Sequence, residues 1–233
     1  MTHLSTTELI TATAGQAVVL GDRAITAGLT TDSRAIVPGC VFLALCGERF
    51  DGNNFAAEAT QKGAAAVVVS RLVGEYAPGS TVVQVADTLL ALQNLAAWWR
   101  SQLEPLHVVG LTGSSGKTST KDMCLSVLSQ KFNALATRGN LNNHIGVPRT
   151  LLRLCPEHEI AVIETGANHP GEIAFLCDMV QADCGLITNV GRAHLEGFGS
   201  FEGVKSTKGE LYDDLISREC FAFLNTKDAN LAN

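Results

Sequence analysis

The second half of the chain alternates short apolar segments with segments of helical length, and this alternation restricts the fold more than any other feature. Strands are predicted at 106–111, 134–137, 159–165, 184–190 and 220–225, and helices at 117–132, 147–154, 171–180 and 200–217. Such alternation is typical of βαβ units, whose strands lie parallel in one sheet. Ligands of parallel sheets bind beyond the carboxyl ends of the strands. The loops after Leu111, Glu164, Val190 and Leu224 are therefore expected to share one crevice.

The first 85 residues predict a smaller α/β unit. The sequence S-T-T-E at Ser5–Glu8 is a capping box that begins a short helix. A second helix is predicted at 55–62, with strands at 17–21, 24–29, 40–46, 64–70 and 81–85. An apolar helix then begins at Asp87, and Pro105 closes it. The predicted fold class is α/β, with a small domain at 1–85 and a parallel-sheet domain at 86–233.

Charge and hydropathy exclude several classes of protein. The chain has 17 Lys and Arg against 23 Asp and Glu, which argues against a nucleic-acid binder because such a protein needs a basic face. With 46% hydrophobic and 17% charged residues, the sequence is too apolar for a disordered chain. The longest apolar run, 64–69, is far shorter than the roughly 20 residues of a membrane span. The first residues also lack the pattern of a signal peptide, so we expect a cytoplasmic protein. We also expect it to be a monomer.

The segment GLTGSSGKT at 110–118, called the glycine loop below, follows a predicted strand and begins a predicted helix. Glycines let backbone N–H groups turn toward phosphates, and the helix N-terminus adds the positive end of its dipole. Lys117 is positioned to reach the β- and γ-phosphates of a nucleotide, and the Thr118 hydroxyl to ligate Mg²⁺. The strict pattern G-x-x-x-x-G-K-[ST] needs glycine where the chain has Leu111, so this loop is a variant. The alternative is a glycine-rich turn with a solvated lysine.

Two residues at strand ends are candidate ligands in the same crevice. Glu164 ends the strand AVIE, where its carboxylate suits Mg²⁺ because hard cations prefer oxygen. The alternative is an ordinary surface glutamate. His194 lies in the loop NVGRAHLEGFGS, and a single loop histidine is more often only a polar surface residue.

Lys208 is predicted to face the interior of its helix. The apolar residues Phe201, Val204, Leu211 and Leu215 fall on one helical stripe, and Lys208 lies on that same stripe. One reading is a lysine with a buried stem and a solvated amine. The other is a lysine whose amine is tuned by burial or chemically modified.

A loop of amide side chains forms a further candidate site. The segment RGNLNNHIGVP at 138–148 contains Asn140, Asn142 and Asn143. Amides both donate and accept hydrogen bonds without carrying charge, which suits contacts with phosphates or sugars. The alternative is turn formation alone, because Asn and Gly also adopt left-handed backbone conformations.

Five segments of the chain resemble the bacterial Mur ligases, in the order in which that family has them. They are GSSGKT, RGNLNNHIGVP, ETGANHPGEI, TNVGRAHLEGFGS and KGELY. Residues 30–69 also resemble the UDP-binding domain of the family. The segment 138–148, called the asparagine loop below, and GANHPGEI are closest to the family member that adds D-alanyl-D-alanine to UDP-N-acetylmuramoyl-tripeptide. The family member that adds the third amino acid of the peptide lacks these two motifs, so it is the second candidate.

The resemblance implies an ATP-dependent amide ligase of peptidoglycan precursor synthesis, which activates the peptide carboxylate as an acyl phosphate. It implies two Mg²⁺ sites, with Thr118, Glu164 and His194 among the ligands. It also implies that Lys208 matches the lysine that the family carbamylates into a carboxylate-like magnesium ligand. We expect Lys117, His194 and Lys208 to serve catalysis. The expected ATP contacts are Gly113, Ser114, Ser115, Gly116, Lys117, Thr118 and Asn225.

The resemblance extends to the substrates. By motif match, the UDP moiety is held near Ser33, Arg34 and Asp51, and the rest of the substrate near Asn140, Asn142 and Asn143. Asn225 matches the start of an adenine-contacting N-x-D segment, although the chain has N-T-K-D there, with Asp228 one position late. Family members carry a third, C-terminal domain, so residues 1–233 alone are expected to show little ligase activity. Two further readings are a chain that binds nucleotides without turnover and a generic P-loop kinase or GTPase.

Overall fold

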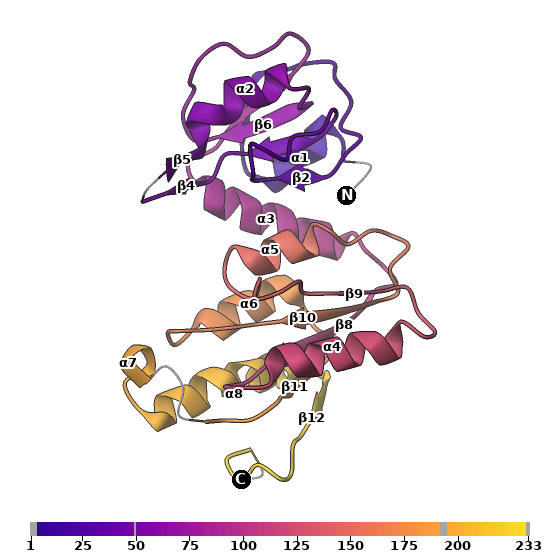
Figure 1. The fold of residues 1–233 in the computed structure, drawn as a ribbon, viewed down its shortest axis with the longest axis vertical. Helices are drawn as coiled ribbons and strands as arrows, with labels where there is room; N and C mark the ends of the chain where they lie inside the picture. Colours follow the sequence, from indigo (N-terminus) through magenta and orange to yellow (C-terminus); the bar gives the residue numbers. More distant parts are fainter. Residues whose placement is uncertain (1–3, 49, 192–194, 232–233) are drawn as a thin grey trace. The chain divides into compact units, whose positions relative to one another are not determined.

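The computed structural model describes residues 4–48, 50–191 and 195–231. The chain divides into two compact units, Met1–Trp99 and Arg100–Asn233, and Figure 1 labels most of their elements. In the described part of the chain, no helix is both long enough and apolar enough to cross a membrane.

The first unit is built on a mixed five-stranded sheet in the order β1-β7-β6-β3-β2. Only β1 runs antiparallel to its neighbour. Its elements are α1 (Thr6–Ala12), β1 (Gln16–Val19), β2 (Leu29–Thr30), β3 (Val41–Leu43), β4 (Cys46–Gly47), β5 (Phe50–Asp51), the 3₁₀ helix η1 (Gly52–Phe55), α2 (Ala56–Gln61), β6 (Ala66–Val69) and β7 (Thr81–Gln84). The helix α3 (Thr88–Ser101) spans the boundary between the units. The predicted capping box at Ser5 and Glu8 is confirmed.

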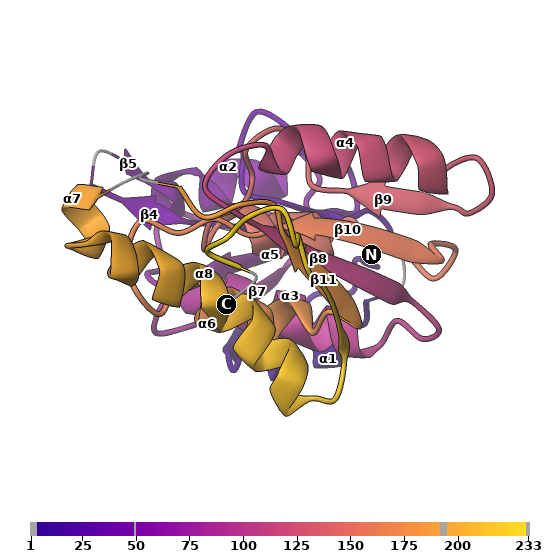
Figure 2. The ribbon, with the colours of Figure 1, turned by 90° about the horizontal axis from the view of Figure 1, so that it is seen from below.

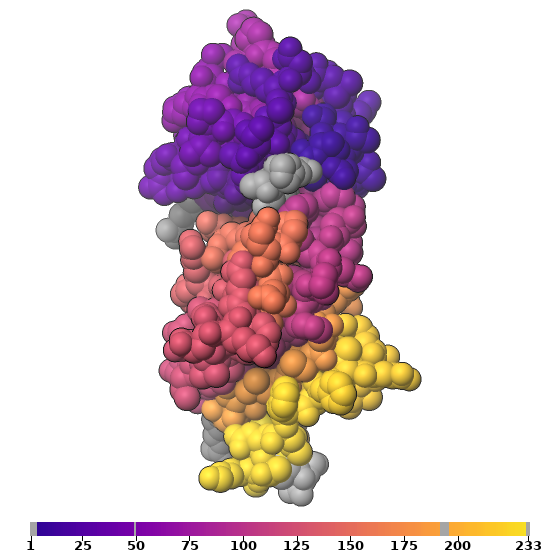
Figure 3. All heavy atoms as spheres, turned by 90° about the vertical axis from the view of Figure 1, so that its right-hand side faces the viewer, coloured from indigo at the N-terminus to yellow at the C-terminus, as the bar shows by residue number. Residues whose placement is uncertain are grey.

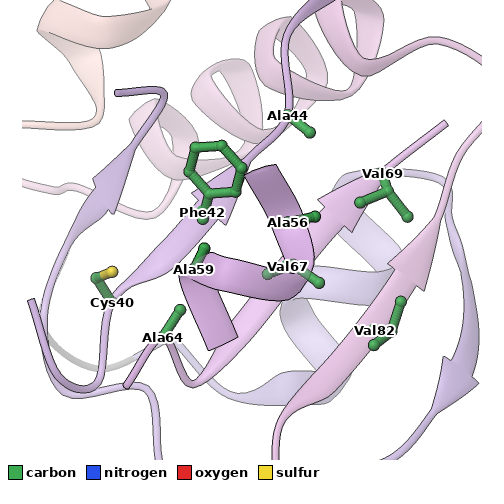
Figure 4. Packing of buried hydrophobic residues seen from close by; sticks show 9 residues of the cluster. All are labelled: Cys40, Phe42, Ala44, Ala56, Ala59, Ala64, Val67, Val69 and Val82. Carbon is green, nitrogen blue, oxygen red and sulfur yellow. The ribbon is translucent and has the colours of Figure 1, made fainter. Parts of the chain in front are cut away.

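The core of the first unit forms where α2 packs on the sheet. Small residues on α2 allow this close approach, and Figure 4 shows them beside side chains of β3, β6 and β7. The cluster consists of Cys40, Phe42, Ala44, Ala56, Ala59, Ala64, Val67, Val69 and Val82. One predicted strand, 24–29, is wrong: only Leu29 and Thr30 pair with β3. Thr26 and Ala27 instead donate their backbone N–H groups to the carbonyl of Gly39.

The second unit contains the parallel sheet that the alternating pattern predicts. The strand order is β12-β11-β8-β10-β9, and every neighbouring pair is parallel. Its elements are β8 (His107–Thr112), α4 (Lys117–Leu128), β9 (Ala134–Ala136), α5 (Gly146–Leu151), β10 (Ile160–Glu164), α6 (Glu172–Val180), β11 (Cys184–Ile187), α7 (Leu195–Phe198), α8 (Phe201–Ser217) and β12 (Phe221–Phe223). The predicted α/β class is confirmed.

The helices of the second unit cover both faces of its sheet. Figure 2 shows α4 on one face, against β9 and β10, and α6 and α8 on the other. The chain therefore leaves the neighbouring strands β8 and β10 toward opposite faces. This divergence is a topological switch point, the place where such sheets bind ligands. The glycine loop begins in the last residues of β8, and Glu164 ends β10, so the fold places both at this point.

The strand β12 forms one edge of the second sheet and leaves its side chains in solvent. Phe221 is 79% exposed and Phe223 is 60% exposed, while Leu224 follows them at 49%. Figure 3 shows the C-terminal part of the second unit, coloured yellow, at the surface. The faces of parallel strands are normally covered, and exposed edge strands normally carry charged residues or proline. By both standards, the exposed side chains of β12 are unusually apolar.

Candidate nucleotide-binding site

The glycine loop forms an open turn between β8 and α4. Gly113 has φ +146° and Gly116 has φ +76°, conformations that favour glycine. A Cβ on Gly113 would lie 2.0 Å from Oγ1 of Thr188, so a side chain cannot be accommodated there. Gly116 caps α4 without a side-chain acceptor, which leaves the first backbone N–H groups of the helix for a ligand. This arrangement matches the anion-binding turn that the sequence predicts.

Asn189 and Thr188 hold the glycine loop in place. Oδ1 of Asn189 accepts from the backbone N–H of Ser115 at 3.1 Å, and Nδ2 of Asn189 donates to the Ser115 carbonyl at 2.9 Å. The Thr188 hydroxyl donates to the same carbonyl at 2.7 Å. Sequence reasoning did not single out these two residues. Their signal was a polar Thr-Asn pair near the end of the predicted strand 184–190, next to the predicted crevice.

Lys117 folds back over the glycine loop. Its Nζ donates to the Gly113 carbonyl at 2.8 Å, which places the ammonium group across the mouth of the turn. It also lines a cavity of about 590 Å³. A cation at this position can neutralise the outer phosphates of a nucleotide whose chain lies in the loop.

Glu164 and Thr118 meet at the switch point. The Thr118 hydroxyl donates to Oε2 of Glu164 at 3.2 Å, and Nδ2 of Asn142 donates to Oε1 at 2.7 Å. Glu164 is only 1% exposed, so the alternative of an ordinary surface glutamate is wrong. A carboxylate and a hydroxyl beside a phosphate-binding turn are the oxygen ligands that Mg²⁺ takes together with phosphates and water.

Among the described residues, the candidate metal site consists of a pair of side chains and not of a cluster. Within residues 4–48, 50–191 and 195–231, no three His, Cys, Asp or Glu side chains gather as they do around a metal ion. The predicted ligand His194 lies outside the described residues. The pair of Thr118 and Glu164 nevertheless fits Mg²⁺, because this ion usually keeps several waters and needs only one or two carboxylates.

The asparagine loop lies beside the glycine loop. Asn140, Asn142 and Asn143 all line the 590 Å³ cavity, as do Lys117 and Lys208. Asn143 also has a structural role, because its Oδ1 accepts the backbone N–H groups of Ile145 and Gly146 at the start of α5. Sequence reasoning missed other residues that line this cavity, namely His144, Asn168, Glu172, Phe175 and Phe198.

Lys208 lies on the buried face of α8, as the helical stripe predicts. The residue is 3% exposed, and its Nζ lies 5.7 Å from the centre of the Phe198 ring. Burial, and then the positive charge of Lys117, lower the pKa of Lys208 to about 8. A substantial fraction of the Lys208 amine is therefore neutral near pH 8, whereas the amine of a surface lysine is almost fully protonated at that pH.

We predict that Lys208→Met stabilises the chain at pH 7, by about 2–3 kcal/mol, because it removes a buried ammonium without shortening the side chain. The pKa of Lys208 is lower in the folded state, so the unfolded chain binds more protons between pH 8 and about 10.4. The stability that Lys208 contributes accordingly rises with pH through this window, and the advantage of Lys208→Met shrinks. Urea unfolding at pH 7 and pH 10, in buffers free of CO₂ so that the amine stays unmodified, measures both effects. Lys205→Met on the same helix is the control, and equal changes in the two variants would contradict the prediction.

Asn225 lies at a second, smaller cavity of about 320 Å³. Its Nδ2 donates to the Thr188 carbonyl at 2.9 Å. Asp228 is not among the residues that line this cavity, and its Oδ2 accepts from the backbone N–H of Val190 at 2.8 Å. Asn225 is thus joined to the glycine loop through the segment of Thr188 and Asn189.

The three predicted UDP contacts belong to the first unit, and the structure gives each a local partner. Arg34 is exposed and pairs with Asp32 at 2.7 Å, while the Ser33 carbonyl accepts from Lys62 at 3.4 Å. Asp51 pairs with Arg71 at 2.5 Å and caps η1. The guanidinium of Arg71 is the main cause that lowers the pKa of Asp51 to about 2.

Comparison with known proteins identifies related chains. The model of the Mur ligase middle domain matches residues 111–233, and the model described as Mur ligase family, catalytic domain, matches residues 26–100. The UDP-N-acetylmuramoyl-tripeptide–D-alanyl-D-alanine ligase of Escherichia coli is 54% identical over 80% of this chain and 40% of its own. That of Haemophilus influenzae is 42% identical over 99% and 50%. A crystal structure of MurF from Acinetobacter baumannii is 41% identical, with a TM-score of 0.88 over 98% of this chain and 49% of that one.

Proposed function

This chain belongs to the Mur ligase family, and from that premise we propose that it serves the ATP-dependent addition of D-alanyl-D-alanine to UDP-N-acetylmuramoyl-tripeptide in peptidoglycan precursor synthesis. The similarity to ligases named for that reaction supports this substrate choice. The chain spans about half the length, or less, of the relatives it matches. The proposal therefore concerns the part that residues 1–233 play in the reaction.

One observation carries the proposal: the glycine loop, Lys117 and the pair of Thr118 and Glu164 meet at the switch point of one parallel sheet. Phosphoryl transfer requires positioning and neutralisation of charge rather than a protein nucleophile. The open backbone N–H groups and Lys117 supply the positive charge, and Thr118 and Glu164 would hold Mg²⁺. When bound, Mg²⁺ neutralises charge on the β- and γ-phosphate oxygens.

The proposed reaction has two steps. A carboxylate oxygen of the peptide attacks the γ-phosphorus of ATP, the bond to the bridging oxygen breaks, and ADP leaves. The amine of D-alanyl-D-alanine then attacks the acyl carbon, phosphate leaves, and the nitrogen loses a proton. We assign the UDP moiety to Ser33, Arg34 and Asp51, by motif match, and the rest of that substrate to the asparagine loop. Asn225 is assigned to the adenine.

Lys208 is proposed to carry a carbamate. Its neutral amine attacks the carbon of CO₂, a nitrogen–carbon bond forms, and one proton is released. The product is an anion with carboxylate-like oxygens, which suits a second Mg²⁺ site. Burial of Lys208 and its lowered pKa support this step, because only the neutral amine is a nucleophile.

NMR of the protein in ¹³C-bicarbonate tests the carbamate. We expect a carbamate signal in the wild type and in Lys205→Met, and none in Lys208→Met. The same signal in Lys208→Met would contradict the assignment.

The function is tested by phosphate release from ATP in the presence of UDP-N-acetylmuramoyl peptides and candidate amines. Release that requires UDP-N-acetylmuramoyl-tripeptide and D-alanyl-D-alanine together supports the proposal. Release that requires a dipeptide substrate and a free amino acid would instead assign the ligase that adds the third residue. ATP binding without any release by residues 1–233 would limit this chain to the binding of nucleotides.

A further inference from the structure

A third cavity in the second unit has a lining rich in cations. It measures about 500 Å³ and lies beside α4, β9 and the residues that follow α5. Its lining includes Lys121, Arg138, Arg153 and His158. Asp122 is the single carboxylate among the lining residues, and its side chain is 64% exposed. The cavity is therefore positively charged, although the whole chain carries a net charge of −6.

Arg153 is the residue whose surroundings call for a ligand. In the described part of the chain, its Nη1 is a buried side-chain nitrogen that finds no hydrogen-bond acceptor. Burial, and then the positive charge of Arg138, lower the pKa of Arg153. A buried guanidinium N–H without an acceptor is costly, so such groups are normally satisfied by a carboxylate, a carbonyl or a bound anion.

Two neighbouring residues offer further donors. Lys121 is 2% exposed, and its one ion pair in the described structure is with the adjacent Asp122, at 3.2 Å. His158 accepts the backbone N–H of Cys155 at Nδ1, at 3.0 Å. The proton of the neutral imidazole is therefore assigned to Nε2, which remains a donor.

We propose that this cavity binds an oxyanion of phosphate type, with Arg153 as its main hydrogen-bond donor and Lys121 and Arg138 as charge partners. The ligand is inorganic phosphate or the phosphoryl group of a monoester, since both present the same oxygens. A guanidinium suits this role because its planar N–H groups match the spacing of phosphate oxygens. The cavity adjoins the nucleotide site, because Thr118 also lines it and Arg138 begins the asparagine loop. Arg153 and Lys121 themselves belong to neither, so the proposal does not depend on the ligase function.

The test is an NMR titration of residues 1–233 with sodium phosphate and with glycerol phosphate, at constant ionic strength set by chloride. The Lys117→Ala background removes the main cation of the glycine loop, so that phosphate bound there does not obscure the cavity. We expect saturable shifts of the backbone signals around Lys121, Arg138 and Arg153. Saturation by inorganic phosphate identifies the free ion as sufficient, whereas saturation by the ester alone identifies a phosphoryl group as the ligand.

Substitutions separate this site from general attraction of anions. Arg153→Gln and Arg138→Gln should each weaken binding by about tenfold or more, the usual effect of a lost charge-assisted hydrogen bond or ion contact. Arg149→Gln, an exposed arginine on the last turn of α5, should leave binding unchanged. Arg138 is exposed, so its variant is expected to fold even if Arg153→Gln does not. Shifts confined to the glycine loop, or equal binding by all three variants, would overturn the proposal.

Discussion

Lys117→Ala is expected to weaken ATP binding to this chain by about 100-fold or more. The substitution removes an ammonium group that lies 2.8 Å from the Gly113 carbonyl, over the turn that we assign to the phosphates. Contacts between an ammonium and phosphate oxygens are charge-assisted and contribute roughly 1.5–3 kcal/mol each, and one lysine can contact two phosphates. The backbone of the loop is held by Asn189 and Thr188 rather than by Lys117, so its shape should survive.

Isothermal titration of residues 1–233 with ATP and Mg²⁺ measures this effect. Lys131→Ala provides the matched control, because Lys131 is an exposed lysine that follows the same helix and contacts the Phe132 ring. The control should bind ATP as the wild type does. If Lys117→Ala also kept wild-type affinity, the glycine loop would be a structural turn and not a phosphate site.

Glu164→Gln is expected to remove most of the contribution of Mg²⁺ to ATP binding. The substitution preserves the shape of the side chain but removes the negative charge. Its amide oxygen can still accept from Asn142, and its amide nitrogen can donate to the Thr118 hydroxyl. Mg²⁺ prefers charged carboxylate oxygens over amide oxygens, so we expect about a tenfold weaker binding of the magnesium complex of ATP. Binding of ATP in the presence of EDTA should stay the same or strengthen, because a charge that repels phosphate is lost.

The two conditions are compared in one titration series. Glu159→Gln is the control, since Glu159 is exposed and lies just before the opposite end of β10. This variant should show the wild-type ratio of affinities with and without Mg²⁺. A wild-type ratio in Glu164→Gln would remove Glu164 from the metal site and leave it as a buried acceptor of two hydrogen bonds.

The parallel sheet was predictable because each of its strands is a short apolar run between polar turns. The order of strands was not, since it depends on which segments pair across the sheet. The wrong strand at 24–29 shows the limit of such patterns. Its residues are apolar enough for a strand, but their N–H groups bond to the turn at Gly39. A propensity for β-structure does not specify the partner, and here the turn competes successfully with the sheet.

The candidate site was predictable where a motif or a periodicity marked it. Lys208 was found because helical spacing alone places it on the buried face of α8. Asn189 and Arg153 were not found, because neither belongs to a periodic pattern. Asn189 is important because it bonds to the glycine loop, which is distant in sequence. Arg153 is important because its buried Nη1 has no hydrogen-bond acceptor in the described structure. Properties of this kind arise only when the chain is folded.

The open side of β12 bears on how copies of this chain meet one another. An unpaired strand edge offers a row of N–H and C=O groups to any second strand, and natural sheets usually block such edges with charges, prolines or bulges. Here the edge presents Phe221, Phe223 and Leu224 instead. In a concentrated solution of residues 1–233, pairing of this edge between molecules therefore competes with the dispersed state, and such pairing requires no unfolding of the sheet.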